Sequence, residues 1–399
     1  MTASLTGEDR TLLCAAHPVP SPERTQRLSR LLTPQLNWGS LIADAERHGI
    51  AALLYSQISA LSPDRIPPAA HEELARRART CVAWNLGLRH ELGRLLAASN
   101  RASIAVMPLK GPVLADQLYP DALLRSTADV DLLVQHDDFA AAERLLEDAG
   151  YRRLPAREQG ADYHIVFMSE SADASGVVVE LHRELGERHV SGLVVRAIWR
   201  SASQTTWEGH QIWSMALPDL LLYLCVHAAK DGLASIRALL DITLLLERYG
   251  DEIPWDDLVD RVKKAHLASP IYLGLSQSRA LLGASVPGEF LDAIRPRRLG
   301  WSLSNALFRW RGGVLHVPED LLVGPVMAIL MFLWEDSPRG RLRHLRRNLL
   351  PSPSLRARWT SVPSSASWVI WYPSWLWHAT RHVVRQVTNR SGITSPPPS

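Results

Sequence analysis

Residues 109–134 read LKGPVLADQLYPDALLRSTADVDLLV, and the end of this stretch holds the pattern that decides the fold. Asp129 and Asp131 flank a valine and are followed by apolar residues. In a β-strand, residues i and i+2 share a face, so we expect both aspartates on one face and the apolar side chains in the core. Two adjacent carboxylates repel each other unless a cation or proton lies between them. The pair is a candidate Mg²⁺ site, although a lone Asp-x-Asp is more often a solvated strand end.

The residues before this pair predict a place for an anion. Apolar residues at 103–109 predict a strand, Lys110 and Gly111 predict a turn, and residues 112–119 predict one or two helical turns. At such a turn the backbone N–H groups face a phosphate, glycine lets the backbone approach it, and lysine adds a positive charge. A Lys-Gly pair alone is a weak signal, so the prediction depends on its place before the acidic pair.

A third carboxylate follows on another apolar stretch. Residues 177–181 predict a strand on which Glu180 is the only acid, and His182 lies two residues further on the same face. His182 has two possible roles. It either acts in the reaction, by orienting the acid or contacting the acceptor, or it is a buried structural histidine.

The order of these motifs resembles a known family. Leu-Lys-Gly, Tyr-Pro, an arginine, Asp-x-Asp-Leu-Leu-Val, a helix ending in Gly-Tyr, a strand with acid-Leu-His and a later helix ending in His-Ala-Ala-Lys follow one another along the chain. This order is similar to that of the uncharacterised nucleotidyltransferases of the polymerase β-like superfamily. The resemblance spans residues 35–250 and, more loosely, continues to about 360.

The resemblance implies a role for each motif. Lys110 and Gly111 resemble the phosphate-binding turn, Asp129 and Asp131 the metal-binding pair, and Glu180 the third catalytic and metal-binding carboxylate. Two departures stand out, because relatives commonly carry Asp at the third position and Gly-Ser at the turn. Glu180 is longer by one methylene group and must sit further back to act as base or ligand.

Three further residues are weaker candidates. Arg125, four residues before the acidic pair, has donors for a triphosphate oxygen, but an ion pair with Asp121 is equally consistent. The apolar stripe over residues 217–231 predicts a helix that places His227 and Lys230 within one turn near its end. We interpret Lys230 as nucleotide-binding and His227 as an acceptor or orienting residue, with an ordinary polar helix end as the alternative.

The pattern along the chain predicts an α+β fold, in which a small mixed β-sheet nucleotidyltransferase core is flanked by N-terminal and C-terminal helical regions. One helix is expected over residues 38–61 and another over 69–98. Strands are expected near 164–168, 177–182 and 211–215. The expected segments are an N-terminal helical region (1–100), the nucleotidyltransferase core (101–216), a C-terminal helical domain (217–348) and a basic Trp-rich tail (349–399).

Composition limits the class of protein. The 399 residues are 46% hydrophobic and 21% charged, which is typical of a globular protein with two or three packed units. The three cysteines have neither a pairing nor a zinc spacing, which favours a reducing cytoplasm. No export signal is recognised at the N-terminus, and the apolar runs at 321–334 and 368–377 are too short to span a bilayer. We therefore expect a cytoplasmic protein, with attachment to the inner face of the membrane as the alternative.

The C-terminal region is strongly basic. Residues 337–399 contain ten arginines and no Lys, Asp or Glu, and residues 359–377 contain five of the 14 tryptophans. Such a segment suits an anionic membrane surface, here through residues 339–390, and nucleic acid is a less favoured partner. Packing against the acidic remainder of the same chain is the plainer alternative. Residues 392–399 are rich in Pro and Ser and are expected to be disordered.

These observations favour an enzyme (EC 2.7.7-like) that transfers a nucleoside monophosphate from an NTP, for example ATP, to a hydroxyl or phosphate acceptor and releases pyrophosphate. The expected cofactor is Mg²⁺, with Mn²⁺ as the second candidate, and the acceptor class stays open between small molecule, peptide and protein. The alternative is a catalytically weak nucleotide-binding or assembly module at a membrane-associated biosynthetic complex. A metal-dependent phosphatase or nuclease fits the paired acids but not the Lys-Gly turn.

Overall fold

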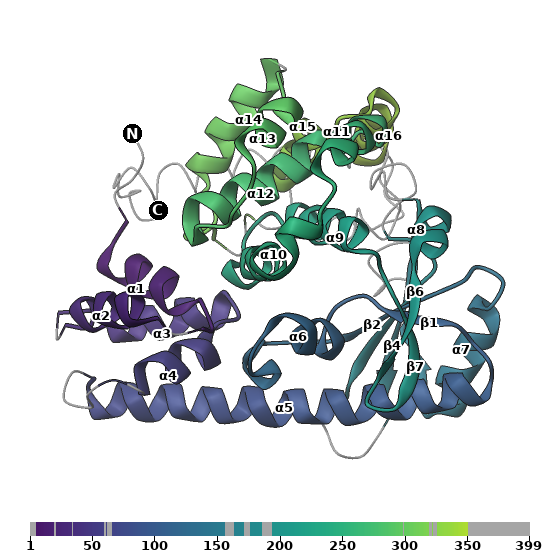
Figure 1. Cartoon of the computed structure of the whole chain (residues 1–399), viewed down its shortest axis with the longest axis horizontal. Coiled ribbons are helices and arrows are strands. Elements are labelled where there is room, and N and C mark those ends of the chain that lie inside the picture. Colours follow the sequence, from purple (N-terminus) through teal and green to yellow (C-terminus); the bar gives the residue numbers. More distant parts are fainter. Residues whose placement is uncertain are drawn as a thin grey trace, which may run out of the picture. The chain divides into compact units, whose positions relative to one another are not determined.

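The fold is α+β, as the sequence predicts. The computed structural model describes residues 5–19, 21–33, 35–59, 61, 66–155, 163–170, 176–185, 194–297, 299–318, 321 and 325–349. Within these ranges it contains sixteen α-helices, a five-stranded sheet and a two-stranded sheet (Figure 1). None of the described helices combines the length and the hydropathy that a bilayer span requires.

Helices form the N-terminal part of the chain, and the fifth is the longest of them. They are α1 (Gly7–Ala15), α2 (Pro22–Leu31), α3 (Trp38–Arg47), α4 (Ala51–Ser59) and α5 (Pro68–Arg101). The single helix expected over 38–61 is wrong, because Gly49 adopts a φ of +69°, in the left-handed region, and separates α3 from α4. The helix expected over 69–98 is present as α5.

The five-stranded sheet is mixed, in the order β1-β2-β5-β4-β3. β2 and β5 are parallel, and the other neighbouring pairs are antiparallel. The short β3 was not expected. The strands are β1 (Val106–Pro108), β2 (Val130–Val134), β3 (Tyr151–Arg153), β4 (His164–Ser169) and β5 (Val178–His182).

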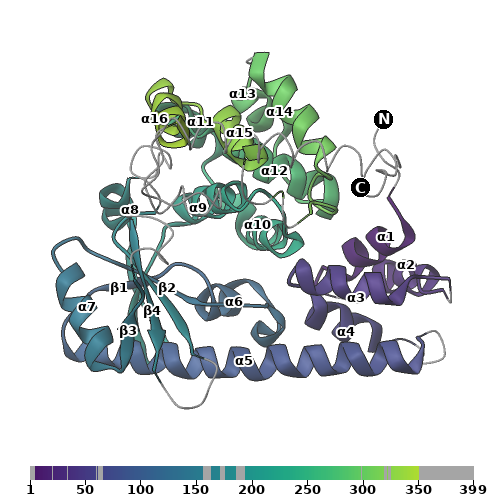
Figure 2. The ribbon, with the colours of Figure 1, turned by 180° about the vertical axis from the view of Figure 1, so that it is seen from behind.

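One face of this sheet packs on the C-terminal half of α5 (Figure 2). Alternate strand residues such as Val130, Leu132 and Phe167 are buried there against Leu92 and Leu96 of α5. Because side chains alternate along a strand, residues 131, 164, 180 and 182 point to the opposite face. The alternation therefore supplies a hydrophobic core on one side and places polar groups on the other.

Short helices and a hairpin complete the mixed region. α6 (Pro112–Leu118) follows the Lys-Gly turn, a 3-10 turn, η2, spans Ala122–Leu124, and α7 (Phe139–Asp148) follows β2. After α8 (Val195–Ser201), strands β6 (Ser203–Trp207) and β7 (His210–Ser214) form a separate two-stranded sheet. Only β7 was expected, and β6 shows little apolar alternation because four of its five residues are exposed.

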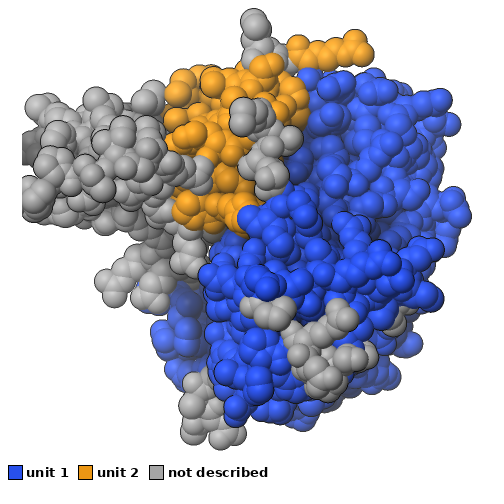
Figure 3. Space-filling view, turned by 90° about the vertical axis from the view of Figure 1, so that its left-hand side faces the viewer, with its two compact units in different colours: residues 1–296 blue, residues 297–399 orange. Residues whose placement is uncertain are grey.

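The chain divides into two compact units, residues 1–296 and 297–399, coloured blue and orange in Figure 3. The four segments expected from the sequence stay a prediction. The first unit continues after β7 with α9 (Leu217–Lys230), α10 (Ile236–Tyr249), the 3-10 turn η3 (Gly250–Glu252), α11 (Trp255–Lys264), α12 (Ala268–Leu282) and α13 (Gly288–Ile294). The second unit contains α14 (Leu299–Trp310), α15 (Pro325–Trp334) and α16 (Pro338–Leu349). The tail from residue 350 onward, including its tryptophans, lies outside the described residues.

Candidate active site

The strand register brings three carboxylates together. Asp131 of β2 is paired with Glu180 of β5 in the parallel ladder, so both side chains lie on the sheet face away from α5. Asp129 lies one residue before the start of β2. One carboxylate oxygen from each of the three residues lies within 4.8 Å of the others.

Lys110 neutralises part of this negative charge. Its Nζ lies 3.1 Å from Oδ2 of Asp131 and 3.7 Å from Oδ1 of Asp129, and only 16% of its side chain is exposed. The lysine follows β1, the antiparallel neighbour of β2. The pairing of these adjacent strands therefore holds the ammonium group of Lys110 beside the acids.

His182 connects two of the acids. Its Nε2 lies 3.0 Å from Oδ1 of Asp131 and 3.3 Å from Oε2 of Glu180. Burial alone would lower the pKa of His182, but the hydrogen bonds to these carboxylates outweigh burial and raise it. The histidine thus adds a second positive or hydrogen-bonding group among the acids.

The two aspartates respond differently to the same burial. Burial and the neighbouring charge of Asp131 raise the pKa of Asp129 to about 6. Burial also acts to raise the pKa of Asp131, but Lys110 and His182 outweigh it and lower that pKa. Asp131 therefore stays ionised in the folded protein, whereas ionising Asp129 there costs free energy.

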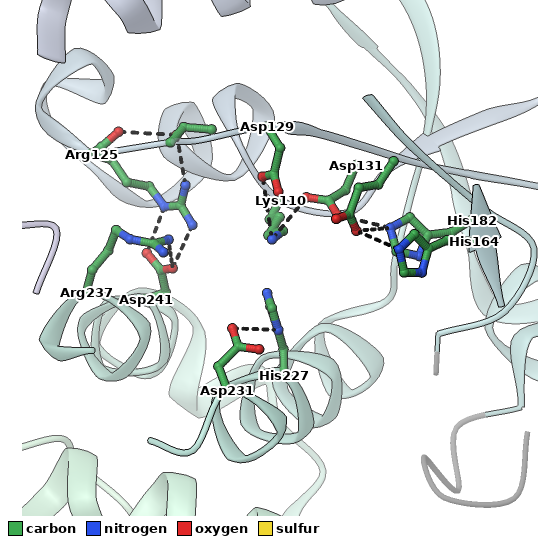
Figure 4. Close-up of polar contacts among 12 residues, drawn as sticks. Lys110, Arg125, Asp129, Asp131, His164, His182, His227, Asp231, Arg237 and Asp241 are labelled. Atoms are coloured by element: carbon green, nitrogen blue, oxygen red, sulfur yellow. Dashed lines mark hydrogen bonds and ion pairs between the residues drawn. The ribbon is translucent and has the colours of Figure 1, made fainter. Parts of the chain in front are cut away.

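Helix α9 supplies the opposite wall of the pocket. Tyr223, His227 and Lys230 of α9 line a cavity of about 200 Å³ together with Lys110 and the carboxylates. Figure 4 shows the His227 side chain pointing from the helix toward Lys110 and Asp129. Nδ1 of His227 lies 3.3 Å from Asp231, and burial lowers the pKa of His227 to about 4.

A tyrosine supports the second lysine of the pocket. Nζ of Lys230 lies 5.1 Å from the ring centre of Tyr163, within cation–π range. Tyr163 also lines the cavity, together with both lysines. The pocket therefore offers carboxylates on the sheet side and cationic groups from Lys110 and α9.

Arg125 does not line this pocket. The structure therefore does not show it where the expected contact with a triphosphate would be made. Its guanidinium is 1% exposed and donates to Asp241 of α10, while Nη1 donates to Oγ1 of Thr127 at 3.1 Å. Among the ion pairs of the described residues there is none between Arg125 and Asp121, whose carboxylate accepts from the backbone N–H of Leu123. The arginine is occupied by a buried contact that the sequence spacing did not indicate.

Gly111 belongs to the turn but not to the residues that line the cavity. It is the N-cap of α6, with φ of 74° and ψ of −139°. A Cβ built there would meet its nearest atom, Cγ2 of Thr127, at 3.5 Å, which is ordinary contact. Glycine is thus required by the backbone conformation rather than by lack of space.

The pocket combines predicted and unexpected residues. Sequence reasoning did not identify Tyr163 or Tyr223, although Tyr223 lies one helical turn before His227 and spacing alone points to it. The predicted residues that line the pocket are Lys110, Asp129, Asp131, Glu180, His182, His227 and Lys230.

The donor set suits a hard divalent cation. Mg²⁺ prefers carboxylate and phosphate oxygens, and three converging carboxylates repel one another without a compensating charge. Asp129, whose pKa is raised, shows where that compensation is least complete. The residues present therefore fit a metal ion held by Asp129, Asp131 and Glu180.

Comparison with known proteins identifies the family. The sequence model of a family described as "Uncharacterised nucleotidyltransferase" matches residues 34–283, which include every residue of the pocket. No curated protein is detectably similar to the chain. Because the match spans more than half of the 399 residues, the chain belongs to this nucleotidyltransferase family. The match confirms the resemblance read from the motifs.

Proposed function

We propose that this member of the nucleotidyltransferase family transfers a nucleoside monophosphate from an NTP to a hydroxyl or phosphate acceptor, in a reaction that depends on Mg²⁺ or Mn²⁺. Pyrophosphate is the second product. Asp129 and Asp131 hold the cation, with Glu180 as third ligand or base. Lys110 and Lys230 bind phosphate oxygens, and His227 faces the nucleotide or acceptor.

A single observation carries the proposal. The oxygens of three carboxylates lie within 4.8 Å of one another in a pocket that also contains two lysines. Nucleotidyl transfer needs little covalent work from the protein, because positioning and charge stabilisation dominate. Converging acids for a cation and lysines for phosphates match those two needs.

When bound, the cation neutralises phosphate oxygens and orients the α-phosphorus for in-line attack. Lys110 changes partner in the proposed complex. In the structure its Nζ is 3.1 Å from Asp131. With a cation held by Asp131, the ammonium group would be free to turn toward a phosphate oxygen. Lys110 compensates the charge of the two aspartates in the structure and would bind the triphosphate in the proposed complex.

In this proposal Glu180 receives the proton of the acceptor. Burial acts to raise its pKa, but the hydrogen bond from His182 outweighs burial and lowers it, so the carboxylate is ionised at neutral pH. In the proposed step the acceptor oxygen loses its proton to Glu180 and bonds to the α-phosphorus. The bond from that phosphorus to the bridging oxygen breaks, and pyrophosphate leaves.

Calorimetry on the full chain tests the proposal. We expect NTP binding that requires Mg²⁺ in the wild type and is lost in Asp131→Asn. Asp137→Asn is the matched control, because that exposed residue lies in the turn after β2. Asp129→Asn is a second variant, and thermal unfolding checks that each protein is folded. NTP binding that is equal with and without metal and unaffected by these substitutions would refute the metal-dependent reaction.

A binding or assembly module at a membrane is the second candidate, and α16 favours it. Leu342 and Leu345 are 68% and 44% exposed on a helix that carries several arginines. Basic amphipathic helices bind anionic bilayers. Sedimentation with anionic and neutral vesicles, run beside a pyrophosphate-release assay, separates the two functions, since vesicle binding without turnover favours the module.

The acceptor is to be found by labelling. Incubation of the protein with labelled NTPs and an extract of its own cells should transfer label to one class of molecule. Loss of that label in Asp131→Asn, but not in Asp137→Asn, would assign the transfer to this pocket.

A further inference from the structure

A second group of potential metal ligands lies beside the three carboxylates. His164 of β4 and His182 of β5 are directly paired in the antiparallel ladder, and their rings are stacked with centres 5.1 Å apart. One ligand atom each from His164, Glu180 and His182 lies within 4.8 Å of the others. Glu180 belongs to both groups, so the two sets meet at one carboxylate.

The distances suit coordination of one cation. Nε2 of His182 lies 3.3 Å from Oε2 of Glu180, and Nε2 of His164 lies 3.7 Å from the same oxygen. Ligand atoms about 2.1 Å from a metal and about 90–120° apart are separated by about 3.0–3.6 Å. The three side chains therefore need only small rotations to share an ion.

The ring nitrogens of His164 make few polar contacts with the described residues. It is 7% exposed, and within the described ranges its Nδ1 has no hydrogen-bond partner while its Nε2 faces only Glu180. Nδ1 of His182 is likewise buried without a partner among those residues. Buried polar groups are normally satisfied. The 3.7 Å from Nε2 of His164 to Oε2 of Glu180 is too long for a hydrogen bond, so this nitrogen of a nine-tenths buried side chain faces a carboxylate without bonding to it, which leaves room for a ligand between them.

We propose that His164, Glu180 and His182 form a second metal site, which takes a borderline divalent cation such as Zn²⁺ or Co²⁺ beside the all-carboxylate site. Imidazole nitrogen suits these ions, whereas Mg²⁺ prefers oxygen. His182 exchanges its hydrogen bond to Asp131 for the cation, and the two oxygens of Glu180 allow it to serve both sites. The metal site is read from these residues alone, and only the catalytic role of Glu180 rests on the proposed function.

Cobalt provides a direct probe of the imidazoles. Co²⁺ is titrated into the metal-free full chain and followed by visible absorption and by proton NMR. We expect two strongly shifted, exchangeable imidazole N–H signals, one from each ligated histidine. In His164→Gln one signal should disappear, and Co²⁺ binding should weaken by at least about tenfold, the lower range for loss of a group that supports a metal. His136→Gln is the matched control, because His136 is exposed and outside both groups.

The wild-type spectrum decides the matter even if His164→Gln fails to fold. Absence of shifted imidazole signals, or signals and affinity unchanged in a folded His164→Gln, would overturn the second site and leave the histidines as hydrogen-bonding groups. The two proposals fail separately. Asp129→Asn should lose Mg²⁺ binding and keep the cobalt signals, whereas His164→Gln should keep Mg²⁺-dependent NTP binding.

Discussion

Arg125 and Asp241 form a buried, two-point ion pair across 116 positions of sequence. Nε of Arg125 donates to Oδ1 of Asp241 at 2.9 Å, and Nη2 donates to Oδ2 at 2.8 Å. The hydroxyl of Tyr119 donates to the same carboxylate at 2.7 Å. Because Arg125 lies in the loop before β2 and Asp241 lies in α10, the pair fixes the segment that leads into Asp129. We interpret Arg125 as a positioning residue (Figure 4).

Removing the arginine should be strongly destabilising. In Arg125→Met the carboxylate of Asp241 is left buried without its main partner, so we expect the free energy of unfolding to fall by about 3–5 kcal/mol in urea titrations. Arg152→Met is the control, because Arg152 is 53% exposed and its ion pair with Glu170 is worth at most about 1 kcal/mol. Pairing Arg125→Met with Asp241→Leu should cost less than the sum of the single changes. A loss below about 1 kcal/mol in Arg125→Met would contradict this reading.

The same pair should weaken in acid. Burial acts to raise the pKa of Asp241, but the charge of Arg125 outweighs burial and lowers it. A carboxyl whose pKa is lower in the folded state stabilises the fold above its unfolded pKa of about 3.9, and this contribution is lost as the pH falls through the folded pKa. The difference in unfolding free energy between wild type and Asp241→Asn should therefore shrink below about pH 4. Urea unfolding between pH 7 and pH 3 measures this difference, and a constant value would argue against the pair.

Two glycines should respond oppositely to the same substitution. Gly111 has φ of 74° and ψ of −139°, a conformation that L side chains rarely adopt, so Gly111→Ala should destabilise by about 1–3 kcal/mol. Gly87 lies within α5 with open space around its Cβ position, so Gly87→Ala should stabilise by about 0.5–1 kcal/mol. Thermal unfolding of both variants tests whether their stability changes in these opposite directions. A neutral Gly111→Ala would show that the turn relaxes.

In the absence of metal, the protein should become more stable when Asp129 is replaced by a neutral residue. The pKa of Asp129 is raised to about 6 by burial and Asp131, against about 3.9 in an unfolded chain. Charging Asp129 in the fold is therefore costly at pH 7, and Asp129→Asn should stabilise the protein in EDTA by about 1–3 kcal/mol. With Mg²⁺ the wild type should gain stability and the variant should not. Asp137→Asn is the control, and destabilisation by Asp129→Asn would contradict the prediction.

Lys110 should affect the triphosphate and the metal in opposite directions. Lys110→Met removes a charged phosphate donor, worth about 1.5–3 kcal/mol, so we expect NTP to bind about 10–100-fold more weakly. Mg²⁺ alone should bind more tightly, because the competing ammonium group is gone. Calorimetry measures both, and Lys264→Met, which changes a side chain that is 82% exposed, is the control. Weaker binding of both ligands would show that Lys110 only maintains the fold.

Local patterns were enough to locate the acids, because strand alternation acts over two residues. The Asp-x-Asp stretch and the strand with Glu180 could each be read alone, and the structure brings them together through the pairing of Asp131 with Glu180. The buried partner of Arg125 could not be predicted, for the complementary reason. Its spacing from the acids suggested a phosphate contact, but its partner, Asp241, lies 116 residues away and has no signature in the local sequence.

The break between α3 and α4 also could not be predicted from the local sequence, although it involves residues close together in the chain. The apolar spacing over residues 38–61 favours one helix, whereas Gly49 in a left-handed conformation divides it. A glycine tolerates a helix interior as well as its end, so the residue type alone does not decide between the two. In the structure both shorter helices pack against α5, a tertiary contact that the local sequence does not encode.

The sequence by itself determined the α+β class, the strands that carry the acids, and the membership of a nucleotidyltransferase family, because these depend on periodicity and on motifs that are local or follow in order. Only the tertiary structure decided which side chains share a pocket. The pairing of His164 with His182, the approach of α9 and the burial of Arg125 against Asp241 arise from contacts between segments far apart in the chain. The energy of such contacts depends on the distance between groups, and that distance is set by the packed fold rather than by sequence separation.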